Sequence, residues 1–183
     1  FHFGGWTFAL GKSSILVDSY EYNIPDYLTH MSLATEFWMN VQPYQWGGAA
    51  YYTTPSGKSM FGASARTSPY GERPFASGLF QYGLSASWSG CDWYNGLWSY
   101  NVFDTGEGTE SAFNMGTKFI LGDNWELVWD STKEFAGSGY MGSNMLYANY
   151  RPADNWYFML RGGFDRAKFF GENFDRWFTG ALA

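Results

Sequence analysis

The stretch FNMGTKFILGDNWELVWD, Phe113–Asp130, contains two alternating segments joined by a short polar turn. Successive residues of a β-strand point to opposite faces, so every second residue shares a face. One face carries Phe113, Met115, Thr117, Phe119 and Leu121, followed by Trp125, Leu127 and Trp129. The other face carries Asn114, Gly116, Lys118 and Ile120, followed by Glu126, Val128 and Asp130. The stretch therefore predicts a β-hairpin with one apolar face and one polar face.

Other segments continue this pattern along the chain. Alternation is clear in Phe80–Trp88, Tyr94–Val102 and Trp156–Asp165. It is weaker in Val41–Thr54, Ser59–Arg66 and Asn144–Tyr150, and the two ends, Phe1–Gly11 and Asp175–Ala183, also have strand character. We expect about ten strands, many of them near the length of roughly 9 to 11 residues that crosses a bilayer at a tilt.

Short polar turns recur at nearly even intervals. They begin at Pro55, Ser89, Leu121 and Arg151, about 30 to 34 residues apart. Between them we expect longer, Gly-rich connections at residues 67–76, 104–110, 134–142 and 166–174. Tight turns at one end and long loops at the other are typical of transmembrane barrels. The sequence therefore predicts an all-β fold, an antiparallel up-and-down transmembrane β-barrel, with residues 1–183 as one domain.

The composition favours the same class of protein. Aromatic residues make up 22% of the chain and charged residues only 15%, whereas charged residues form about a quarter of ordinary soluble domains. Mean hydropathy is −0.32, and no run of about 20 apolar residues predicts a membrane-spanning helix. A net charge of −6 without a basic cluster argues against a nucleic-acid partner. The single cysteine, Cys91, excludes a disulfide within the chain.

The two faces of the predicted strands suggest two environments. The apolar face would contact lipid, with Trp and Tyr side chains forming girdles at the membrane interfaces. The residues expected in these girdles are Trp88, Tyr94, Trp98, Trp125, Trp129 and Trp156. The polar face would line a water-filled pore, with Arg66, Lys118, Glu126, Asp130, Arg161 and Asp165 as its charged residues. A soluble sandwich or lipocalin-like barrel is the alternative, although a dry core would not accept these charges.

Residues 18–40 break the alternating pattern. This is the longest irregular segment, and Leu28–Met39 has apolar residues at roughly helical spacing. Long connections of this kind are often functional. In a barrel the segment would fold inward as a constriction loop, with Tyr20, Glu21, Tyr22 and Asp26 narrowing the pore. The other interpretation is a surface loop with a short packed helix.

One short motif points to a known family. The segment Trp6-Thr7-Phe8-Ala9-Leu10-Gly11-Lys12 is a strand that ends in Gly-Lys and leads into the long irregular segment. This order resembles the start of diffusion porins of the Gram-negative outer membrane, of the general or phosphate-selective type. The resemblance implies a passive pore with the irregular segment in its lumen, and Gly11 and Lys12 are the matched positions. Because such porins contain more than ten strands, the chain is expected to be a small barrel or part of a larger one.

Signals of enzymatic chemistry are weak. His30 lies near Asp26 and Thr29 without a nucleophile motif, and no Gly-x-Ser-x-Gly sequence occurs. No pair of His or Cys residues has metal-ligand spacing. The acidic segment Asp104–Glu110 could supply oxygen ligands for Ca²⁺, but it lacks the spacing of an EF-hand. We therefore expect neither an enzyme nor a cofactor or metal site.

The leading hypothesis is an outer-membrane porin through which small hydrophilic solutes or ions diffuse. The expected partners are the lipid bilayer, the solute, and further copies of the chain or a larger outer-membrane complex. A second hypothesis is a barrel that anchors or binds a partner protein, and a third is a soluble, aromatic-rich carbohydrate-binding protein. The chain start, Phe1–Trp6, lacks the features of a signal peptide, which predicts a mature chain or a segment of a longer one.

Overall fold

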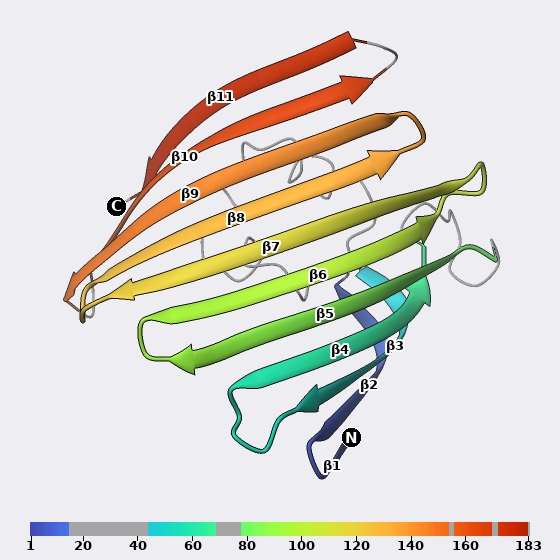
Figure 1. Ribbon diagram of the computed structural model, residues 1–183, viewed down its shortest axis with the longest axis horizontal. Coiled ribbons are helices and arrows are strands. Elements are labelled where there is room, and N and C mark those ends of the chain that lie inside the picture. The colour runs from blue at the N-terminus through green and yellow to red at the C-terminus, as the bar shows by residue number, and fades with distance from the viewer. Residues whose placement is uncertain (15–43, 69–77, 154–155, 170–171, 183) are drawn as a thin grey trace.

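The computed structural model describes residues 1–14, 44–68, 78–153, 156–169 and 172–182, and these residues form one antiparallel sheet of eleven strands (Figure 1). Each strand pairs with the next in the chain, so the order is up-and-down throughout. The predicted all-β, antiparallel, up-and-down architecture is thus confirmed, with eleven strands in place of about ten. Within the described ranges no helix is long and apolar enough to cross a membrane.

The strands lengthen toward the C-terminal half of the chain. They are β1 (His2–Phe3), β2 (Trp6–Ser14), β3 (Tyr44–Thr53), β4 (Ser59–Thr67), β5 (Phe80–Cys91), β6 (Tyr94–Asp104), β7 (Thr109–Leu121), β8 (Trp125–Ala136), β9 (Gly139–Ala153), β10 (Trp156–Phe169) and β11 (Glu172–Leu182). From β5 onward every strand has 11 residues or more. These lengths suffice to cross the apolar part of a bilayer at a tilt.

The hairpin predicted from Phe113–Asp130 is present. Strands β7 and β8 pair from Leu121 opposite Trp125 to Glu110 opposite Ala136. Gly122 in the connecting turn has φ 75°, a left-handed conformation that glycine adopts without a steric penalty. The turn residue and the matching alternation on both sides therefore fix the same register.

Two predicted long connections are wrong. Strand β6 ends at Asp104 and β7 begins at Thr109, while β8 ends at Ala136 and β9 begins at Gly139. Segments 104–110 and 134–142 are thus tight hairpin turns flanked by strand residues, with Gly106 (φ 84°) and Gly137 (φ 57°) at the bends. These segments are rich in polar residues, as loops are. Most of their residues nevertheless belong to the ends of β6, β7, β8 and β9.

The other two connections are described only in part. The predicted loop at 166–174 is mostly strand, because β10 continues to Phe169 and β11 starts at Glu172. Of segment 67–76, only the first two residues are described. Residues 18–40, with the predicted helical turn, also lie outside the described residues.

The sheet is strongly curved, and β2 and β3 turn away from the plane of the central strands (Figure 1). Among the described residues, β1 and β11 are the two edges of the sheet, and no ladder joins them. The described strands therefore form a partial ring. A small apolar cluster of Val128, Met145, Tyr147 and Met159 is buried on one face, with Tyr157 packed against it.

Candidate functional site: the buried polar face

The two faces of the sheet have the reverse of the burial expected in a soluble protein. Leu84 and Leu160 are 63% and 62% exposed. On the opposite face, Arg161 is 2% exposed and Asp165 is fully buried. Burying charges while exposing large apolar side chains is unfavourable in water, so this distribution departs from the usual surface of a soluble protein.

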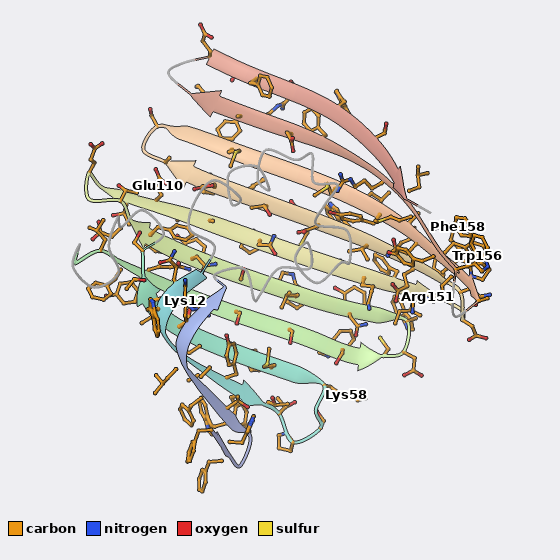
Figure 2. The ribbon with its side chains drawn as sticks, turned by 180° about the vertical axis from the view of Figure 1, so that it is seen from behind. Lys12, Lys58, Glu110, Arg151, Trp156 and Phe158 are labelled. Carbon is orange, nitrogen blue, oxygen red and sulfur yellow. The ribbon has the colours of Figure 1, made fainter. Side chains whose placement is uncertain are left out.

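Aromatic side chains form a row on the exposed face near one end of the strands. Ring pairs include Trp88–Tyr94 at 5.4 Å, Tyr94–Phe119 at 5.5 Å, Trp125–Tyr150 at 4.4 Å, Tyr150–Phe158 at 6.4 Å and Trp156–Phe158 at 5.8 Å. Figure 2 shows Trp156 and Phe158 near Arg151 at this end of the sheet. The row follows the turns that connect β5 to β6 and β7 to β8.

All six residues predicted for the girdle lie on the exposed face. Trp88, Tyr94, Trp125 and Trp156 belong to the row at the turns. Trp98 and Trp129 lie four residues further along their strands, opposite Met115 and Thr117 of β7. Their role at a membrane interface stays a prediction.

Hydrogen bonds connect neighbouring strands on the buried face. The Asn114 Nδ2 group donates to Asp130 Oδ1 at 3.0 Å and to Thr132 Oγ1 at 2.7 Å. Gln81 Nε2 donates to Asn101 Oδ1 at 3.1 Å. Asn114 thus links β7 to β8. One of its two acceptors is a carboxylate, and both hydrogen bonds are buried, where they are stronger than in water.

The six predicted pore-lining residues all lie on this polar face, on four strands. Arg66 is in β4, Lys118 in β7, Glu126 and Asp130 in β8, and Arg161 and Asp165 in β10. Lys118 Nζ lies 3.5 Å from Glu126 Oε1, and both side chains are partly exposed. The other four are almost completely buried. The residues line a surface and do not converge on one catalytic centre, and their role in a pore stays a prediction.

Several buried polar residues were not among the predicted site residues. They include Gln81, Asn101, Asn114, Glu134 and Asn149. Glu134 falls in a segment predicted as a loop, but Asp130, Thr132 and Glu134 continue one face of β8. The alternation extending past Thr132 was the signal that could have identified it.

Other predicted features lie elsewhere. Tyr20, Glu21, Tyr22 and Asp26 of the expected constriction loop are outside the described residues, as is His30. In the acidic turn, the Gly106 amide donates to Asp104 Oδ1 at 3.0 Å and the Thr105 amide donates to Gly108 O at 3.0 Å. The described part of the chain contains no cluster of three or more His, Cys, Asp or Glu residues that could hold a metal ion.

Comparisons with protein-family models, with curated proteins and with solved structures gave no match to this chain.

Proposed function

We propose that the chain forms the wall of a transmembrane β-barrel in a bacterial outer membrane and acts as a pore for passive diffusion of small hydrophilic solutes. The observation that carries this proposal is the inverted burial of the two faces. Lipid would cover the apolar face, and the polar face would enclose the interior.

The dimensions of the apolar face support this placement. On β5 the face extends from Phe80 to Trp88. The eight steps from the first to the last of these nine residues span about 27 Å along a strand, or roughly 20 Å along the membrane normal at a tilt of about 40°. A barrel's apolar band is about 25 Å tall. Because hydrocarbon cannot pair with backbone groups, the proposal includes closure of the ring across the edges β1 and β11.

The charged residues of the buried face would act on solutes inside the barrel. Arg66 and Arg161 are cationic, while Asp130, Glu134 and Asp165 are anionic. Charges of both signs along a narrow path orient water and ions and set ion preference, as charged rings do in other channels. The proposed mechanism therefore needs no covalent chemistry and no cofactor.

Conductance across a planar lipid bilayer tests the pore. We expect stepwise channels from the folded protein, and a shift of reversal potential toward cation preference in Arg161→Gln. Lys58→Gln is the matched control, since Lys58 is exposed in the turn between β3 and β4 (Figure 2). A protein that inserts but never conducts would refute the pore, and one that stays in solution without detergent would favour the carbohydrate-binding alternative.

One observation favours a second candidate, a closed barrel that anchors a partner protein. Four charged residues of the polar face, Arg66, Asp130, Arg161 and Asp165, are almost completely buried, whereas a wide open pore would leave them accessible. In that case the protein would insert without conducting, and a specific partner would be retained when it is purified from its native membrane in mild detergent.

A further inference from the structure

A groove of about 610 Å³ lies on the exposed apolar face over β8–β11. Its lining includes Trp129, Leu146, Leu160, Gly162, Phe164 and Trp177. The register places these residues on one face, since Trp129 is opposite Leu146 and Phe164 is opposite Trp177. Gly162 has no side chain and Ala148 has a short one, so the floor is low between aromatic walls. The shape and lining suit a flexible hydrocarbon chain.

Basic residues lie on the same face beyond one end of the groove. Arg166 of β10 is opposite Gly142 of β9, and Gly142 is opposite Lys133 of β8. A Cβ atom at Gly142 would lie 3.8 Å from Lys133 Cγ and 3.7 Å from the Arg166 carbonyl oxygen. Lys133 and Arg166 therefore flank Gly142 on this face, with no side chain between them at that position. Lys168, also exposed, is one residue pair further along this face.

Arg166 also contacts the wall of the groove. Its guanidinium lies 5.3 Å from the centre of the Phe164 ring, and that ring packs at 4.5 Å from Trp177. Two hydrogen bonds of 2.9 and 3.0 Å hold the guanidinium to Asp175. The Arg166 and Asp175 side chains are 54% and 44% exposed. The cation is thus fixed at the mouth of the apolar groove and remains accessible from outside.

We propose that this groove is a binding site for an anionic membrane phospholipid. One acyl chain would occupy the groove between Trp129 and Trp177, and the phosphate would lie between Lys133 and Arg166. The inference rests on the proposed membrane insertion. Charge complementarity selects the occupant, because among the described residues three cations, Lys133, Arg166 and Lys168, outnumber the one carboxylate, Asp175, at this mouth. Arginine and lysine form charge-assisted hydrogen bonds with phosphate oxygens.

Native mass spectrometry of the whole chain tests the preference. The protein is released from vesicles containing equal amounts of phosphatidylglycerol and phosphatidylcholine. We expect bound phosphatidylglycerol to exceed phosphatidylcholine, and Lys133→Gln to weaken that binding about fivefold, the effect of one basic residue at an anionic membrane surface. Lys58→Gln, in the turn between β3 and β4, is the matched control and should leave binding unchanged.

Two further variants should change lipid binding in opposite directions. Gly162→Leu places a side chain on the floor of the groove and should reduce binding of both lipids. Asp175→Asn removes the carboxylate that holds Arg166 and should increase binding of phosphatidylglycerol. Equal retention of the two lipids by the unaltered protein would overturn the proposal, as would equal losses in Lys133→Gln and Lys58→Gln. A second copy of the chain bound in place of lipid would also overturn it.

Membrane insertion is measured separately on the same vesicles by flotation and protease protection. A protein that does not insert would refute the proposed function and the lipid site together. A protein that inserts but shows no preference for the anionic lipid would refute the lipid site alone.

Discussion

At the scale of single residues, the environment of a side chain decides which substitutions its position accepts. Leu84 is 63% exposed at the centre of β5. In water, an exposed position of this kind accepts a charge within about 0.5 kcal/mol. In a membrane the same position faces hydrocarbon, where arginine costs about 2–4 kcal/mol near the bilayer centre. The identity of the surrounding solvent can therefore be tested at one residue.

Leu84→Arg should lower the free energy of unfolding in lipid vesicles by about 2–4 kcal/mol. Thr109→Arg is the control, because Thr109 is exposed at the end of β7, and it should change stability by less than about 1 kcal/mol. Urea-induced unfolding followed by tryptophan fluorescence measures both variants. Equal stability of Leu84→Arg and the unaltered protein would indicate that Leu84 faces water.

The buried face gives a second prediction at this scale. Asn114→Leu removes the hydrogen bonds to Asp130 and Thr132 and should destabilise the protein by about 2–3 kcal/mol, because one acceptor is a carboxylate. Asn173→Ala, at an exposed residue of β11, serves as the control. A decrease of less than about 0.5 kcal/mol in the free energy of unfolding of Asn114→Leu would mean that water replaces both hydrogen bonds.

At the scale of elements, the hairpin turns fix which strand residues are opposite one another. Gly137 has φ 57° in the turn between β8 and β9, and a Cβ atom added there would meet no heavy atom of the described residues within 4 Å, its two chain neighbours aside. A substitution there is therefore opposed by backbone conformation and not by crowding. Gly108, in the turn between β6 and β7, has equally open space but no left-handed φ.

Gly137→Ala should destabilise the protein by about 1–2 kcal/mol, the cost of a left-handed conformation for a residue with a Cβ atom. Gly108→Ala should be close to neutral. Urea unfolding of the two variants measures the difference. Equal effects would show that the turn at Gly137 changes conformation without cost.

At the scale of the whole molecule, the up-and-down order places successive turns at opposite ends of the sheet. Cys91 lies at the end of β5, beside the turn to β6. Ser138 lies in the turn between β8 and β9, at the other end and exposed. If the sheet crosses a membrane, these two positions lie on opposite sides of it.

A maleimide attached to a polymer too large to pass a diffusion pore, added outside sealed vesicles, should label only one of the two positions. Cys91 is labelled in the unaltered chain, and Ser138→Cys is labelled in a Cys91→Ser background. The protein is first inserted in a single orientation. We then expect one cysteine to react in sealed vesicles, and the other to react only after detergent opens them. Reaction of both in these sealed vesicles would contradict a transmembrane arrangement.

Alternation in the sequence determined the strands and their two faces, because side-chain direction in a strand depends only on local geometry. It placed Lys118 and Asp130 on one face and Trp125 and Trp129 on the other. Local composition did not determine where the strands end, so Glu134 falls in a segment predicted as a loop. Only the tertiary structure showed the bonds of Asn114 to β8 and the groove beside Lys133 and Arg166. The first depends on the exact register of β7 and β8, and the second on the curvature of β8–β11, neither of which alternation alone defines.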